Sequence, residues 1–208
     1  MANVSYNNII ESVNSGIEVA VKEHLKLTNN ETELSWAPEY FINVNIVKKL
    51  KTLSASYVNL EEPMGESWEP PKGKAPEDWK PNKRYDIVVR KSNNFPYAAI
   101  EVKNRVYKVS DREIEDFKRI STAVNSKENG ENVFKMGIFA FYTVFDEDYT
   151  NQTEKKENIL DLYSNLEKEL KRLKGRAEVD SDHLFDPTPY THLENSVWGG
   201  GCFILSPQ

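Results

Sequence analysis

The stretch that decides the fold is RYDIVVRKSNNFPYAAIEVK, which runs from Arg84 to Lys103. Two runs rich in apolar and β-branched residues, over 84–90 and 97–103, predict two strands. The linker SNNFP over 92–96 is rich in turn-forming residues. We therefore expect the two strands to pair as an antiparallel hairpin.

The side chains of this hairpin follow the alternation of a strand, in which every second residue points to the same face of the sheet. Glu101 and Lys103 therefore share one face, while Ile100 and Val102 point into apolar packing. If the hairpin turns about the middle of its linker, residues whose numbers add up to 187 face each other. This register places Asp86 directly across from Glu101.

Two carboxylates on opposite positions are the chemically informative feature of the hairpin. Directly opposed like charges destabilise a sheet by up to about 1 kcal/mol at its surface, and by more when they are desolvated. A bound cation makes such a pair tolerable, and carboxylate oxygens with water are the ligands that Mg²⁺ or Mn²⁺ prefers. Lys103 lies one pleat beyond Glu101, where it could orient or deprotonate a water molecule or stabilise charge on a phosphate.

The rest of the chain predicts helices around this sheet. Apolar residues recur at helical spacing in three segments, 5–27, 38–54 and 154–174. Ser110 and Glu113 form the capping-box signature that starts a further helix. Glu39 lies on the apolar stripe of the second segment, one turn before Ile42, so it could reach the Asp86–Glu101 site from above the sheet. Further strands are expected at 56–60, 134–144 and 203–205.

Three segments are expected to lack regular structure. Residues 61–83 hold five prolines, two glycines and two tryptophans, which predicts a long irregular flap. His183 and His192 are interpreted as parts of a polar loop, because their nine-residue spacing matches no compact metal-binding motif. The run Gly199–Gly201 is expected to form a turn or bulge, and Cys202 to be a buried thiol.

Together these elements predict a mixed α/β fold in a single domain over 1–208. Its core, over 38–144, would be a central mixed sheet flanked by helices. An extra N-terminal helix would precede the core, and a C-terminal helix with a tail strand would follow over 154–208.

Asp86, followed fifteen residues later by Glu101-Val102-Lys103 on an adjacent strand, resembles the PD-(D/E)XK nuclease superfamily. The resemblance covers roughly residues 38–144 and implies a restriction-endonuclease-like αβββαβ core. One position departs from the pattern, because Tyr85 stands where the name-giving proline would precede Asp86.

Carried over residue by residue, the resemblance implies a metal site. Asp86 and Glu101 would bind Mg²⁺ or Mn²⁺ together with the backbone carbonyl of Val102, and Lys103 would be the catalytic lysine. Glu39 resembles the helical glutamate that some families add to the metal site. The implied activity is metal-dependent hydrolysis of phosphodiester bonds in DNA, in a restriction, defence or repair setting.

Several basic residues could contact the substrate. Arg84 begins the first strand, and Arg112, Lys118 and Arg119 lie on the helix that follows the motif. The alternative for the two helical arginines is pairing with Asp116, which is four residues from Arg112 and three from Arg119.

Two other interpretations of the chain stay open. It could be a non-catalytic module with a nuclease fold that recognises DNA or a protein partner. It could also be an unrelated α+β interaction protein whose Asp86, Glu101 and Lys103 are solvated surface residues. The 154–174 helix offers a surface for a homodimer or a protein partner.

The composition bears on whether the protein binds nucleic acid or contacts a membrane. The 208 residues carry 27 basic and 33 acidic side chains, for a net charge of −6, which argues at first sight against binding nucleic acid. Residues 84–127, however, hold ten basic and six acidic side chains, a local charge of +4. No apolar run approaches the ~20 residues of a membrane helix, so we expect a cytoplasmic protein with no membrane contact.

Overall fold

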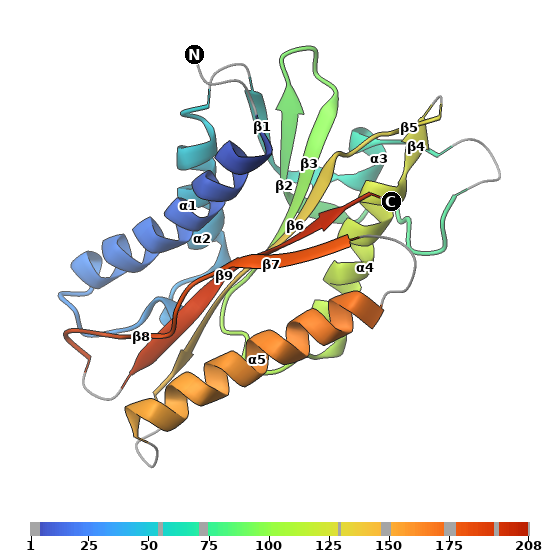
Figure 1. Cartoon of the computed structure of the whole chain (residues 1–208). Helices are drawn as coiled ribbons and strands as arrows, with labels where there is room; N and C mark the ends of the chain where they lie inside the picture. Colours follow the sequence, from blue (N-terminus) through green and yellow to red (C-terminus); the bar gives the residue numbers. More distant parts are fainter. Residues whose placement is uncertain are drawn as a thin grey trace.

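The computed structural model describes residues 5–53, 56–70, 75–128, 130–146, 151–172, 178–193 and 196–207. Its centre is a mixed sheet of seven strands in which six follow the order β1-β2-β3-β6-β9-β7, while β8 pairs with β9 (Figure 1). The strands are β1 (Ser56–Pro63), β2 (Arg84–Lys91), β3 (Pro96–Lys103), β6 (Met136–Phe145), β7 (Glu178–Leu184), β8 (Thr188–Pro189) and β9 (Val197–Ser206).

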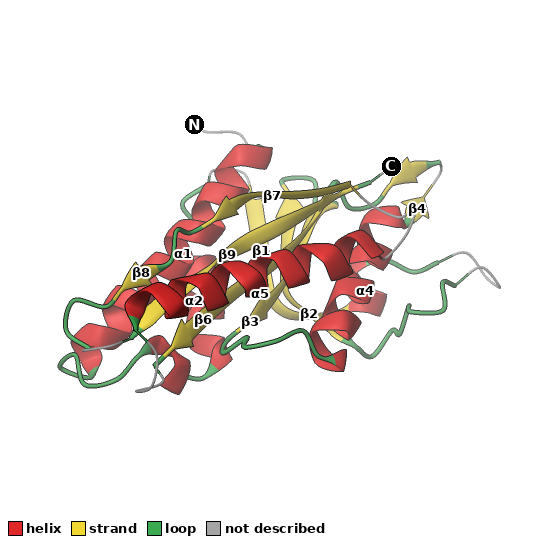
Figure 2. Cartoon of the chain, turned by 60° about the horizontal axis from the view of Figure 1, so that its bottom comes forward, coloured by secondary structure: helices red, strands yellow, loops and turns green. Residues whose placement is uncertain are grey.

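Long helices cover both faces of this sheet (Figures 1 and 2). One apolar cluster joins the sheet to α1 (Tyr6–Leu27) and α2 (Glu39–Leu50), and a second joins its other face to α4 (Asp111–Asn125) and α5 (Gln152–Arg172). In Figure 2, α5 crosses in front of the strands. The short elements are η1 (Leu34–Trp36), α3 (Met64–Ser67) and the small hairpin of β4 (Lys127–Glu128) and β5 (Glu131–Asn132). The predicted mixed sheet between helices is confirmed.

The predicted hairpin also has the predicted register. β2 and β3 pair antiparallel, and the pairs Ile87↔Ile100, Val88↔Ala99 and Val89↔Ala98 all add up to 187. A bulge shifts the register between Val89 and Arg90, next to the turn. From β3 the chain crosses through α4 to β6, which pairs parallel with β3. α4 therefore lies over the strand that carries Glu101 and Lys103.

The helix boundaries follow local signals. Ser5 caps α1 by accepting a hydrogen bond from the Asn8 N–H, and Ser110 and Glu113 form the predicted capping box at the start of α4. The second predicted helix ends earlier than expected, at Leu50 instead of residue 54.

The prediction of an irregular flap over 61–83 is wrong at its start. β1 continues to Pro63, and α3 forms one turn over Met64–Ser67. The remaining described residues of the flap, 68–70 and 75–83, have neither helix nor strand. A buried ion pair explains the order at the start, because Arg90 binds the Glu62 carboxylate and also donates to the Glu66 carbonyl at 3.2 Å.

Two further predictions of irregular structure are wrong. His183 lies in β7, although His192 lies outside the helices and strands as expected. Gly199–Gly201 lie within β9 instead of forming a turn or bulge. The glycines are needed for close packing, because a Cβ added at Gly199 would lie 2.3 Å from the Tyr163 hydroxyl. That hydroxyl accepts a hydrogen bond from the Gly200 N–H at 2.6 Å. Cys202 is a buried thiol, as expected.

The Glu62–Arg90 pair predicts an acid-sensitive contribution to stability. Burial acts to raise the pKa of Glu62, but hydrogen bonds from Arg90, Ser67 and Asn59 outweigh it, so the pKa lies below its ordinary value. An acid with a lowered folded-state pKa stabilises the protein above its unfolded-state pKa, and this contribution is lost as the pH falls through the folded-state pKa. We expect Glu62→Gln to lower the free energy of unfolding by about 1.5–3 kcal/mol at pH 7.

Urea unfolding of wild type and variant at several pH values measures this difference. It should shrink as the pH falls below 4.5, the ordinary pKa of a glutamate. Glu66→Gln is the matched control, because the Glu66 side chain is exposed and four residues away. A difference between Glu62→Gln and wild type that stays constant down to strongly acidic pH would contradict the prediction.

Candidate active site

The candidate site lies where β2 and β3 run beneath α4. The alternation of β3 places Ala99, Glu101 and Lys103 on the face covered by α4, while Ile100 and Val102 pack toward α1 and α2. Glu101 is fully buried and Lys103 is 4% exposed. The predicted division of these side chains between the two faces is therefore confirmed.

Asp86 and Glu101 are brought together as the register predicted. The Asp86 carboxylate accepts a hydrogen bond from the Val102 N–H at 2.7 Å, and Asp86 and Glu101 lie close enough for each to affect the pKa of the other. Burial raises the pKa of Asp86, although Lys103 and the Val102 N–H act in the opposite direction. Burial also raises the pKa of Glu101 far above its ordinary value, and the nearby Asp86 adds to that effect. Burial therefore disfavours the ionised form of both carboxyl groups.

Arg119 supplies a compensating positive charge from α4. Its Nε and Nη2 donate to the two oxygens of Glu101 at 2.8 and 3.0 Å, which is a bidentate ion pair. Nη2 also contacts Asp116, one turn earlier on the helix. The Arg119–Asp116 pair was the alternative foreseen from helical spacing, whereas the contact with Glu101 was not foreseen.

Lys103 lies among three acidic groups. Its Nζ lies 2.9 Å from Asp116 Oδ2 and 3.4 Å from Glu39 Oε1, and it donates to the Val102 carbonyl at 3.1 Å. Burial acts to lower the pKa of Lys103, but the carboxylates of Asp116, Glu39 and Asp86 outweigh it and raise the pKa. Lys103 is therefore a cation at neutral pH, suited to stabilise negative charge and not to remove a proton from water.

Glu39 reaches this cluster from the first turn of α2, as its position on the helix predicted. Its carboxylate forms an ion pair with Lys103 and accepts a hydrogen bond from the Asn104 N–H. Arg112 Nη2 lies 3.2 Å from Oε2 of the same carboxylate. The foreseen pairing of Arg112 with Asp116 is wrong, because Arg112 binds Glu39 instead. Ion pairs between these acidic and basic side chains thus connect α2, β3 and α4.

The basic residues expected at the substrate lie around the edge of this cluster. Arg84 and Arg112 are exposed. Lys118 and Arg119 line a small cavity of about 90 Å³ whose other walls are Asp78, Lys80, Lys83 and Glu115. The lysines at 80 and 83 were not singled out from the sequence, although they stand just before β2.

A divalent cation fits the donor chemistry of Asp86 and Glu101 but not that of the whole predicted ligand set. Within the described ranges, no group of three or more His, Cys, Asp or Glu side chains is arranged to hold a metal ion. The Glu39 carboxylate already forms ion pairs with Lys103 and Arg112, and the Val102 carbonyl already accepts a hydrogen bond from Lys103. Mg²⁺ is commonly held by only one or two carboxylates, with water and substrate phosphate completing its shell. The Asp86–Glu101 pair meets that smaller requirement in number, but Arg119 binds both Glu101 oxygens in this structure, so an ion there would have to displace its guanidinium.

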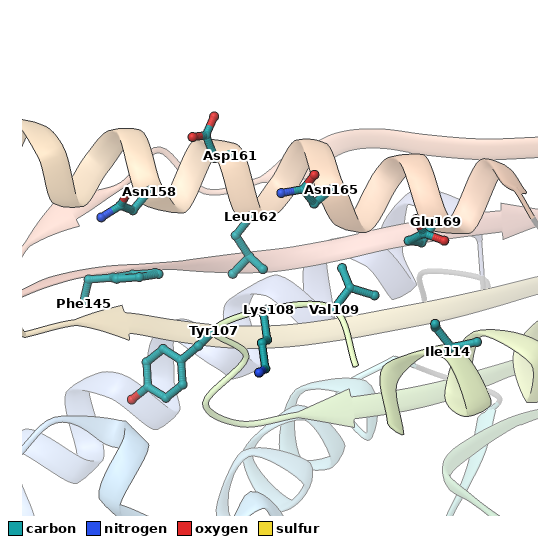
Figure 3. A pocket seen from close by; sticks show the side chains of 10 residues that line it. All are labelled: Tyr107, Lys108, Val109, Ile114, Phe145, Asn158, Asp161, Leu162, Asn165 and Glu169. Carbon is teal, nitrogen blue, oxygen red and sulfur yellow. The ribbon is translucent and has the colours of Figure 1, made fainter. Parts of the chain in front are cut away.

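A larger groove lies apart from these residues. It has a volume of about 630 Å³ and runs between α5 and the segment from Tyr107 to Ile114 (Figure 3). Asn158, Asp161, Asn165 and Glu169 line it from α5, so this wall is polar and partly acidic. None of Asp86, Glu101 and Lys103 lines it.

Comparison with known proteins adds no relative to this description. No protein-family model matches the chain, and neither does any curated protein or solved structure. Among the described helices, none is long and apolar enough to cross a bilayer.

Proposed function

We propose that this protein is a divalent-metal-dependent nuclease that hydrolyses phosphodiester bonds in DNA. The observation that carries the proposal is that Asp86 binds the Val102 N–H and so lies beside Glu101 on the neighbouring strand, with Lys103 one pleat further on the same face as Glu101. The order α2-β1-β2-β3-α4-β6 supports a restriction-endonuclease-like core. A setting in restriction, defence or repair agrees with that core by analogy alone.

The side chains divide the chemistry between them. When bound, Mg²⁺ would polarise the scissile phosphate and lower the pKa of a water molecule. Asp86 and Glu101 would hold the ion through their carboxylates. Lys103 stays positively charged and, aligned by Asp116 and Glu39, stabilises the negative charge that develops on the phosphate.

The surroundings of the site suit a polyanionic substrate. The cavity between Lys80, Lys83 and Lys118 is also lined by Arg119, whose guanidinium binds the buried Glu101. Arg84 begins β2 and is exposed. These residues would contact phosphates on either side of the scissile bond, and such contacts are expected to weaken steeply with salt.

A second candidate function rests on Arg119. Because its guanidinium occupies both oxygens of Glu101, the same fold could serve as a non-catalytic module that recognises DNA or a protein partner. In that case the Arg119–Glu101 pair is structural, and the site needs no metal.

Cleavage of labelled plasmid and linear DNA with Mg²⁺, Mn²⁺ or EDTA tests the proposal. We expect products with either metal and none with EDTA. Isothermal titration with Mn²⁺ separates the two candidates, because the nuclease should bind the ion through Asp86 and lose that binding in Asp86→Asn. Absence of both cleavage and Asp86-dependent Mn²⁺ binding would favour the non-catalytic module.

A further inference from the structure

Three exposed side chains form a stacked arrangement beside the candidate site. The Arg105 guanidinium lies over the ring of Trp36 at 6.0 Å and over the ring of Tyr107 at 5.9 Å. Trp36 is 68% exposed and Tyr107 is 42% exposed. We call Trp36, Arg105 and Tyr107 the aromatic platform. Grouped large aromatic rings at a surface commonly mark a binding site, whereas single ones need no explanation.

The platform is assembled from two segments that are far apart in the sequence. The Asn104 side chain donates to the carbonyls of Leu34 at 3.1 Å and Ala37 at 2.8 Å, which ties the end of β3 to η1. Arg105 follows in the left-handed region, with φ of 63°. A non-glycine residue there costs of order 1–3 kcal/mol and persists only when its surroundings hold it. The backbone held by Asn104 thus places the Arg105 guanidinium near both rings.

The platform is next to the proposed catalytic groups. Arg105 comes two residues after Lys103. The Asn104 N–H donates to the Glu39 carboxylate, which also forms an ion pair with Lys103. Tyr107 packs edge-on against Phe145, with the ring centroids 5.8 Å apart. Tyr107 and Lys108 line the groove on the side opposite α5, and Figure 3 shows their side chains pointing away from α5 and its acidic residues.

The charge around the platform suits a nucleic-acid strand. Residues 103–112 hold four basic side chains and one acidic one. Lys103 is buried against Glu39 and Asp116, and Arg112 binds Glu39. Arg105 and Lys108 are therefore the exposed basic side chains that would face a ligand. Aromatic rings stack with bases, and basic neighbours contact the phosphates between them. In a duplex the faces of the bases are covered by their neighbours, so the platform suits bases that are unpaired.

We propose that the aromatic platform binds an unpaired nucleic-acid strand by stacking its bases on Trp36 and Tyr107. The inference rests on the proposed function for its link to cleavage, and it names the substrate class as single-stranded or locally unpaired nucleic acid. Arg105 holds the rings apart and contacts the backbone. Lys108 would guide the strand toward Lys103.

Fluorescence anisotropy with a labelled oligothymidylate of about 20 nucleotides tests this inference in EDTA, where cleavage plays no part. We expect Trp36→Ala and Tyr107→Ala each to weaken binding by about fivefold or more, since a stacked base contributes about 1–3 kcal/mol. Tyr57→Ala is the matched control, because Tyr57 is 57% exposed on β1 and outside the platform. It should bind like wild type. Wild type should bind a duplex of the same length more weakly, and the platform substitutions should change the affinity for that duplex little.

The outcomes separate this inference from the proposed function. Unchanged oligothymidylate binding in both platform variants, with their circular dichroism spectra intact, overturns it. Equal losses for duplex and single strand overturn it as well. Loss of binding in the platform variants supports it even if wild type cleaves nothing with Mg²⁺, in which case only the proposed function fails. Oligouridylate in the same assay distinguishes an RNA strand from a DNA strand, and dependence on the platform with either probe supports stacking.

Discussion

Asp86→Asn is expected to reduce metal-dependent DNA cleavage by about a thousandfold or more, because it removes one of two carboxylates in the proposed metal site. The substitution keeps the size of the side chain and an oxygen that can accept from the Val102 N–H. Initial rates of cleavage with saturating Mn²⁺ measure the effect. Cleavage by the variant at the wild-type rate would sink the assignment of Asp86 and, with it, the nuclease proposal.

Stability measurements on the same variant show whether the loss is chemical. Burial raises the folded-state pKa of Asp86, so its ionised form destabilises the fold at neutral pH. Asparagine carries no charge, and Asp86→Asn should therefore unfold at the same temperature as wild type or at a higher one. A residue that costs stability while supporting activity has a functional role. A large fall in the melting temperature would instead show that Asp86 holds the hairpin together.

The geometry of the hairpin could be predicted because its causes are local. Alternation assigns Glu101 and Lys103 to one face, and a short linker centred near 93–94 leaves one register. The same reasoning found Glu39, since its position on the stripe of α2 places it toward the sheet. These relations depend only on spacing along the chain, which a single sequence contains.

The partner of Glu101 could not be predicted in the same way. Helical spacing pairs Arg119 with Asp116, and the structure keeps that contact. The second contact, with Glu101, depends on where α4 crosses β3, which is determined by the packing of Phe117 and Ile120 against the sheet. The same spacing misassigned Arg112, because Glu39 of α2 lies closer in space than Asp116.

The errors in the irregular segments have a related cause. Prolines and glycines favour the end of a helix or strand, but tertiary contacts override that tendency. Glu62 and Arg90 hold the residues at the start of the flap in a strand. The Tyr163 hydroxyl fills the space that a side chain at Gly199 would need, and the Phe141 carbonyl fills the space at Gly200. His183 lies in the edge strand β7, where exposed positions tolerate polar residues.

Arg119→Met is expected to lower the free energy of unfolding by about 3–5 kcal/mol in EDTA, because it leaves the fully buried Glu101 without its bidentate partner. The proposed metal site adds a second expectation. A divalent cation beside Glu101 would replace the charge of the lost guanidinium, so Mn²⁺ should raise the melting temperature of this variant more than that of wild type. Thermal unfolding followed by circular dichroism, across a series of Mn²⁺ concentrations, measures both effects.

The double variant Glu101→Gln/Arg119→Met is the control that separates the ion pair from the metal. Replacing both charges removes the uncompensated carboxylate, so the double variant should be more stable than Arg119→Met alone. It should also lose most of the response to Mn²⁺, because only Asp86 remains as a carboxylate ligand. If Mn²⁺ stabilises the double variant as strongly as Arg119→Met, the ion binds elsewhere. If Arg119→Met is destabilised but indifferent to Mn²⁺, Glu101 is a structural acid whose only cation is Arg119.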